Sequence, residues 1–343
     1  MHKNRFSQNI STLDLLANCI YRLTIVAFAV FVGTLSHAAT DIMQRGPFVV
    51  HSAEYQLPAK VDPEILDGVK TELWAKTYWP ESPNASASLS VPRPILFFLH
   101  GNHGTCGQGS APRDDYGCEY TFSGQCPKNS VVVPNHLGYQ YAAEQLASLG
   151  FIVVSINANL GITCGDGPDG DDGLIIARGR LVLKHIEKWM EWNSRGGAPK
   201  TLGPENQWIK RIDFSNVGLM GHSRGGEGMR AAYNLAISPK NSWKSRLPGL
   251  QIKGVFEIGS VDGMSSKVFD ANGTSWVQLL PLCDGDVRSL EGRLPFERML
   301  NAKDEASGHP KTLFEVWGAN HNFFNTEWQV NDSLGCFQHD PIF

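Results

Sequence analysis

The sequence lacks the features that would place it in several common classes of protein. Its net charge is −4 over 343 residues, so it has no basic excess of the kind that binds nucleic acid. No two cysteines have the C-x-x-C spacing, which argues against zinc and redox motifs. No internal repeat or linker is visible, and the apolar run Leu23 to Leu35 is about half as long as a membrane-spanning helix requires.

The same apolar run indicates export. Arg22 precedes it, and Ser36-His37-Ala38-Ala39 follows it, with small residues at 36 and 38 as signal peptidase requires. We therefore predict a signal peptide over 1–38, a single domain over 39–343, and a secreted or periplasmic protein without a stable membrane span. The alternative is an amphipathic or anchoring helix.

Cysteine content is consistent with an oxidising compartment. Beyond Cys19, which the signal peptide would remove, six cysteines remain, an even number that suggests three disulfides in an exported protein. Six cysteines allow 15 connectivities. We expect the bonds Cys118–Cys126, Cys106–Cys164 and Cys283–Cys336.

Strands and helices alternate along most of the chain. Residues 95–99 form a short apolar run, typical of a strand buried on both faces. Further strands are predicted at 48–57, 71–79, 151–157, 217–220, 252–258, 277–282 and 313–317, the first two antiparallel, with helices at 137–149, 174–192 and 225–236. This order predicts the α/β class, with a mostly parallel, doubly wound sheet flanked by helices in one domain.

A candidate nucleophile lies where one of these strands meets a helix. Gly221-His222-Ser223-Arg224-Gly225 follows the apolar strand 217–220 and opens into the helix 225–236. A sharp strand-to-helix turn would lift the Ser223 hydroxyl above the sheet edge, and glycines two residues away on either side let the backbone pass closely. The amide of Arg224, next in the chain, is a candidate donor to an oxyanion.

A serine hydroxyl needs a base, and the base needs an acid to orient it. Downstream of Ser223 the chain has only His309, His321 and His339. Of these, His321 follows a predicted strand at its carboxyl end, where active sites gather in such sheets. The acid should follow the preceding strand, which leads into Cys283-Asp284-Gly285-Asp286. We favour Asp284 over Asp286, with Asp262 third.

Together, these residues resemble the α/β-hydrolase superfamily. The likeness comprises His100-Gly101-Asn102, Gly221 to Gly226, Asp284 and Gly318-Ala319-Asn320-His321, in family order over roughly residues 70–325. Gly-His-Ser-Arg-Gly-Gly also resembles the corresponding turn of chlorophyllases and of bacterial lipases and cutinase-like polyesterases. The resemblance implies an α/β-hydrolase fold and a second oxyanion donor at Asn102. It also implies ester hydrolysis through an acyl-enzyme. We accordingly expect a monomeric esterase or lipase that uses no cofactor or metal and acts on small-molecule, lipid or polymeric esters.

The sequence departs from cutinase-like enzymes in two places, so the substrate does not carry over. These are the cysteine-rich loop 104–126 and the acidic run Asp166-Gly-Pro-Asp169-Gly-Asp171-Asp172. The acidic run could wrap a calcium ion, but a solvated turn at a helix N-terminus fits its residues better. A serine peptidase or amidase, and a catalytically silent binding protein on the same fold, remain alternative functions.

Overall fold

A computed structural model describes residues 44–81, 91–111, 113–168, 170–302, 308–329 and 335–338. Residues from Arg45 onward form one compact unit. The predicted signal peptide, residues 1–38, lies outside the described residues, as do Asp169 and His339.

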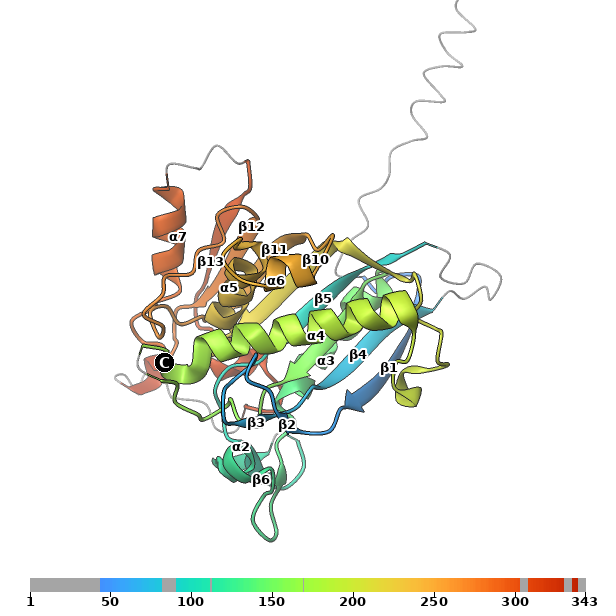
Figure 1. The fold of residues 1–343 in the computed structure, drawn as a ribbon. Coiled ribbons are helices and arrows are strands. Elements are labelled where there is room, and N and C mark those ends of the chain that lie inside the picture. Colours follow the sequence, from blue (N-terminus) through green and yellow to red (C-terminus); the bar gives the residue numbers. More distant parts are fainter. Residues whose placement is uncertain are drawn as a thin grey trace, which may run out of the picture. The chain divides into compact units, whose positions relative to one another are not determined.

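The central sheet has eight strands and is mainly parallel (Figure 1). Its spatial order is β1 (Val49–Gln56), β4 (Trp74–Glu81), β9 (Ile152–Asn157), β5 (Arg93–Leu99), β10 (Ile212–His222), β11 (Ile252–Ile258), β12 (Ser275–Pro281) and β13 (Lys311–Val316). β4 runs antiparallel to both of its neighbours, and every later pair is parallel. The predicted α/β class, the mainly parallel sheet and its antiparallel start are confirmed.

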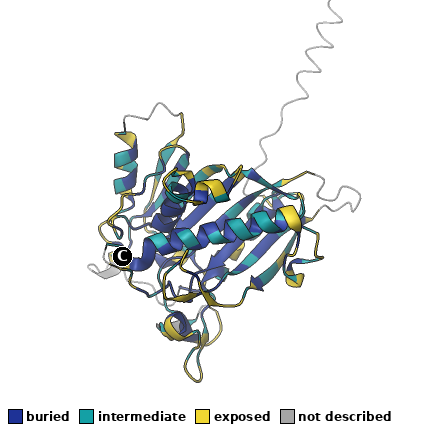
Figure 2. Ribbon diagram, in the orientation of Figure 1, coloured by how far each residue is buried: buried dark blue, intermediate teal, exposed yellow. Residues whose placement is uncertain are grey.

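Side chains that alternate along the strands belong to two hydrophobic cores, one on each face of the sheet. In β5, Ile95, Phe97 and Leu99 join the larger core, whereas Phe98 faces the smaller one. This is the two-residue period of a strand buried on both faces. Figure 2 shows how burial concentrates in the strands and on the sides of the helices that face them.

Helices cover both faces of the sheet. The larger core packs against α4 (Ile175–Arg195) and α5 (Arg224–Ile237), and the smaller one against α3 (Gln140–Ser148). α6 (Trp243–Arg246) and α7 (Arg293–Leu300) are shorter, and 3-10 turns are η2 (Asn135–Tyr139), η3 (Asp172–Leu174), η4 (Lys200–Leu202), η6 (Asn322–Phe324) and η7 (Gly335–Gln338). No helix among the described ranges is long and apolar enough to cross a membrane.

The cysteine-rich loop folds as a small structure of its own. It holds a three-stranded sheet in the order β7 (Asp114–Gly117), β6 (Cys106–Gln108) and β8 (Val131–Val132), together with helix α2 (Glu119–Ser123). A separate two-stranded sheet pairs β2 (Lys60–Val61) with β3 (Lys70–Thr71).

Three disulfides are present among the described residues, and one of the three expected pairings is confirmed. Cys283 is bonded to Cys336 as predicted, but the other bonds are Cys106–Cys126 and Cys118–Cys164. The predicted Cys118–Cys126 and Cys106–Cys164 pairs are wrong, because the folded loop instead brings Cys126 beside Cys106 (5.5 Å between Cα atoms) and Cys164 beside Cys118 (6.0 Å). Both separations lie within the usual range for a disulfide.

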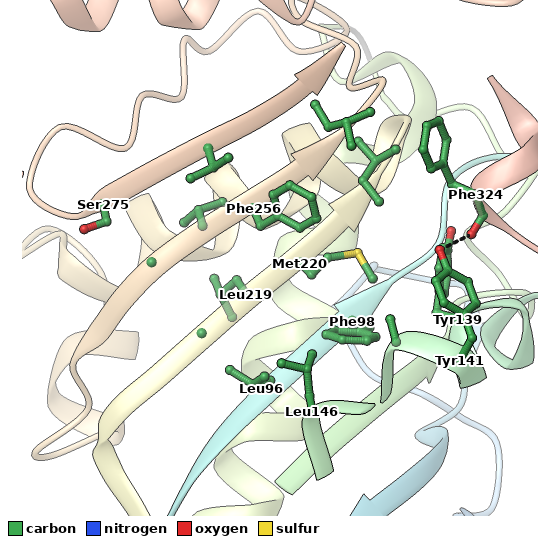
Figure 3. A pocket seen from close by; sticks show the side chains of 17 residues that line it. Leu96, Phe98, Tyr139, Tyr141, Leu146, Leu219, Met220, Phe256, Ser275 and Phe324 are labelled. Atoms are coloured by element: carbon green, nitrogen blue, oxygen red, sulfur yellow. Dashed lines mark hydrogen bonds between the residues drawn. The ribbon is translucent and has the colours of Figure 1, made fainter. Parts of the chain in front are cut away.

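An apolar groove of about 440 Å³ lies on the sheet face that α3 covers only in part (Figure 3). Strands β5, β10, β11 and β12 form its floor through side chains such as Leu96, Met220 and Phe256. At one end Tyr141 donates a hydrogen bond to the carbonyl oxygen of Phe324 (3.0 Å), drawn as a dashed line. This end adjoins the residues that follow β13.

Candidate active site

Ser223 sits on a tight turn between β10 and α5. It adopts φ 56° and ψ −128°, a conformation that a non-glycine residue holds at a cost of about 1–3 kcal/mol. Its amide donates to the carbonyl oxygen of Ile258 on β11 (2.9 Å), which fixes the turn against the neighbouring strand. A Cβ at Gly221 would lie 2.2 Å from the Gly225 oxygen, and one at Gly225 only 2.4 Å from the Leu99 oxygen. Both glycines are therefore required by close backbone packing.

His321 and Asp284 form a buried pair beyond the ends of β13 and β12. Asp284 Oδ2 lies 2.6 Å from His321 Nδ1. Its other oxygen, Oδ1, accepts from the amides of Asp286 (2.9 Å) and Val287 (2.7 Å). Because a carboxylate only accepts, Nδ1 carries the proton, which leaves Nε2 of His321 as the basic nitrogen. His321 is 1% exposed, so the pair is shielded from water.

The other two candidate acids lie elsewhere. Asp286 Oδ2 lies 3.5 Å from His321 Nε2, the nitrogen opposite Asp284, and its side chain is 56% exposed. Asp262 binds Arg230 and Arg298 instead of the histidine. Asp284 is thus the carboxylate that the structure brings to Nδ1.

His222 links the turn at Ser223 to the main chain of His321. Its Nε2 lies 2.9 Å from the carbonyl oxygen of His321, and its Nδ1 lies 3.0 Å from the Tyr139 hydroxyl. A carbonyl only accepts, so Nε2–H donates to it and Tyr139 donates to Nδ1. Burial holds the pKa of His222 well below its usual range, and the nearby His321 lowers it further, so the ring stays neutral. This residue, adjacent to Ser223, thereby fixes the main chain that carries His321.

The turn that carries Ser223 is tied to a segment beside the same pair. Gly259, next to the Ile258 that holds the Ser223 amide, lies against the pair: a Cβ there would be 3.2 Å from His321 Nδ1 and 3.4 Å from Asp284 Oδ2. Within the described residues, Ser223 Oγ makes no hydrogen bond. Catalytic hydrogen bonds in free enzymes commonly tighten only when a substrate binds.

The loop after β5 packs directly on Ser223. A Cβ at Gly101 would lie 2.5 Å from Ser223 Cβ and 3.1 Å from its Oγ, so only glycine fits there. The neighbouring Asn102 uses its side-chain oxygen to accept from the Cys164 amide (2.7 Å), which anchors the loop next to the Cys118–Cys164 disulfide. In the described part of the chain, no hydrogen bond uses the main-chain amide of Asn102 or of Arg224. Both are thus available as donors beside Ser223.

Side chains of both charges surround the site. Burial lowers the pKa of the Arg224 side chain, and the carboxylates of Asp166, Asp286 and Asp172 act in the opposite direction. In the acidic run, Asp171 accepts the Ile176 amide at the start of α4 (3.0 Å), as expected of a helix N-terminus. The described residues contain no cluster of three potential metal ligands; Asp169, a member of this run, lies outside them.

Three further histidines lie in other settings. His100 is fully buried and accepts the Ala158 amide (2.9 Å), while His103 stacks on Trp328 at 4.7 Å. His309 is exposed before β13. Sequence reasoning missed the supporting roles of Tyr139 and His222, because neither has a spacing that marks it.

Comparison with known proteins adds no assignment. The chain matches no model of a protein family, and no curated protein is detectably similar to it. Function must therefore be argued from the geometry of the site.

Proposed function

We propose that this chain is a serine hydrolase that cleaves carboxylic esters through an acyl-enzyme, on an α/β-hydrolase fold. The observation that carries the proposal is the buried Asp284–His321 pair (2.6 Å) beside Ser223 on its strained turn. The topology supports it, because the three residues follow β10, β12 and β13 of one parallel sheet, in the order nucleophile, acid, base.

Each residue has a defined task in this mechanism. Ser223 Oγ attacks the ester carbonyl carbon while His321 Nε2 accepts its proton, and Asp284 stabilises the imidazolium. The amides of Asn102 and Arg224 stabilise the negative charge on the former carbonyl oxygen. His321 then gives its proton to the departing alcohol. Water, deprotonated by the same nitrogen, attacks the acyl-enzyme and releases the acid, and the proton returns to Ser223.

Hydrolysis of p-nitrophenyl esters of graded chain length tests the proposal. Purified protein should release p-nitrophenol and should react with a fluorophosphonate probe at Ser223. Ser223→Ala should abolish both activities, whereas Ser245→Ala, at an exposed serine of α6, should leave them intact. Full activity in Ser223→Ala, or no reaction of the native protein with ester or probe, would refute the assignment. Parallel assays on peptide amides separate an esterase from an amidase.

We also infer that the protein is exported. Three disulfides fit an oxidising compartment, and the sequence of residues 22–39 fits a cleaved signal. The mature protein recovered from the periplasm or the medium should begin at Ala39. An uncleaved N-terminus on protein retained in the cytoplasm would contradict this.

A further inference from the structure

Arg178 on α4 is a buried cation that the mechanism above does not use. Its side chain is fully buried, and it donates from Nε to the Gly173 oxygen (3.2 Å). Its Nη1 donates to the oxygens of His100 (3.2 Å) and Gly101 (3.4 Å). Within the described chain, Nη2 has no hydrogen-bond partner and no carboxylate pairs with the guanidinium. Burial of an unpaired charge is strongly unfavourable, so this position calls for an explanation.

Arg230 shows that the same protein neutralises a buried arginine where it can. It is equally buried, in the next helix, and it pairs with Glu257 (2.9 Å) and Asp262 (2.7 Å). The acid that acts most on Arg178, Asp171, instead binds the Ile176 amide. The guanidinium of Arg178 is thus surrounded by main-chain carbonyl groups in place of acids.

Close packing of α4 against α5 holds Arg178 near the turn that carries Ser223. A Cβ at Gly228 of α5 would lie 2.9 Å from Arg178 Cβ, and one at Gly179 of α4 would lie 2.8 Å from the Ala232 amide nitrogen. These glycines let α4 approach the helix that begins directly after Ser223. The side chain of Arg178 therefore reaches the loop that follows β5.

The carbonyl groups that Arg178 binds belong to the peptides of that loop. The Gly101 oxygen shares its peptide unit with the amide of Asn102, and the His100 oxygen shares one with the amide of Gly101. In a planar trans peptide the C=O and N–H bonds point in opposite directions. Holding the oxygens toward α4 therefore turns the amides away from it. A cation on the oxygen also polarises the peptide and strengthens its N–H as a donor.

We propose that Arg178 is a positioning residue of the oxyanion site: it orients and polarises the Gly101–Asn102 peptide, and its charge is compensated when the tetrahedral intermediate forms. This rests on the proposed ester hydrolysis. Burial and the nearby Arg224 lower the pKa of Arg178 to about 9, which leaves the group charged at neutral pH. Its stabilising effect is then larger for the anionic transition state than for a neutral bound ester.

Kinetics of Arg178→Met and Arg178→Lys test the proposal, with Arg230→Met as a matched control of equal burial. In Arg178→Met, kcat for a p-nitrophenyl ester should fall about 10- to 100-fold while KM stays within about twofold, less than the loss on removing an oxyanion donor itself. Affinity for a trifluoromethyl ketone, whose adduct carries an oxyanion, should fall by a similar factor. In Arg178→Lys, kcat should lie between those of Arg178→Met and the native protein, because lysine retains the positive charge but lacks the several N–H donors of the guanidinium. Arg230→Met should lower the melting temperature yet keep kcat per folded molecule.

The outcomes separate this proposal from the one on which it rests. A folded Arg178→Met variant with native kcat, or with only a raised KM, would overturn the role of Arg178 and leave ester hydrolysis standing. If that variant does not fold, Arg178→Lys decides: a several-fold lower kcat at unchanged KM supports the role, and native kcat overturns it. A native protein that neither cleaves esters nor reacts with the fluorophosphonate overturns the hydrolase proposal itself.

Discussion

The Cys283–Cys336 bond closes a loop that contains His321 and begins beside Asp284. We expect its removal to lower the stability of the protein much more than its activity. The two cysteines are 53 positions apart, and loop-closure entropy for that length gives about 4 kcal/mol at 25 °C. The loop does not overlap those of the other two disulfides. In a chain of this size, a loss of that order should lower the melting temperature by about 6 °C.

Activity should respond far less than stability. The Cys283 amide donates to the Ala319 oxygen (3.0 Å), and the Gly285 amide donates to Asn320 Oδ1 (3.4 Å). These contacts join the segments that carry the acid and the base without the covalent bond. In a double Cys283→Ala, Cys336→Ala variant, kcat at 25 °C should therefore stay within about threefold of the native value, since catalytic geometry is preserved.

Thermal unfolding followed by circular dichroism, together with ester kinetics well below the transition, measures both effects. A double Cys106→Ala, Cys126→Ala variant is the control, because that bond lies in the separate cysteine-rich loop. An unchanged melting temperature would refute the loop-closure reasoning. A large loss of kcat without a change in melting temperature would show that the bond is needed for the geometry of the site.

Three further predictions concern single residues. Asp284→Asn should lower kcat about 10⁴-fold, as loss of the orienting acid does in serine hydrolases, while Asp286→Asn should cost less than about tenfold because it leaves Nδ1 paired; equal losses in stopped assays would contradict the assignment. Burial raises the pKa of Glu227 from 4.5 to about 7, so the folded state binds its proton more tightly than the unfolded state. Stability should then fall by roughly 3 kcal/mol as pH rises from 4.5 to 7, and Glu227→Gln should remove that slope in urea titrations. Gly101→Ala should reduce kcat at least about 100-fold, since its Cβ would lie 2.5 Å from Ser223 Cβ and displace an oxyanion donor; native kcat would show that the loop can yield.

The sheet was predictable from sequence because its strands carry strong local patterns. The five apolar residues 95–99 can only be buried on both faces, and the structure places them in β5, between β9 and β10. β10 was predicted too short, at 217–220 against Ile212–His222, because its first half mixes Asp213, Ser215 and Asn216 with apolar residues. α7 was missed because it is only eight residues long and carries Pro295 in its first turn.

Within the site, the sequence identified the residues that follow predicted strands. It did not identify residues whose partners are far away along the chain. Asp284 and His321 stand out because each closes a predicted strand. The pairings Cys106–Cys126 and Cys118–Cys164 depend on how the cysteine-rich loop folds in space, which the spacing of the cysteines does not show. Arg178 had one visible signal: it lies on the apolar face of its helix, three residues before Leu181 and four before Val182. A charged residue at such a position marks a buried polar contact, but its partners are set by tertiary packing alone.

The apolar groove over β10, β11 and β12 has a practical consequence for measurements on this protein. A folded molecule with a pocket of about 440 Å³ lined by Leu96, Met220 and Phe256 should bind hydrophobic dyes such as anilinonaphthalene sulfonate. Fluorescence of that kind, usually taken as a sign of a molten state, would then come from the native fold. Detergent monomers would compete for the same groove, so dye-based melting curves should depend on detergent while circular dichroism curves should not.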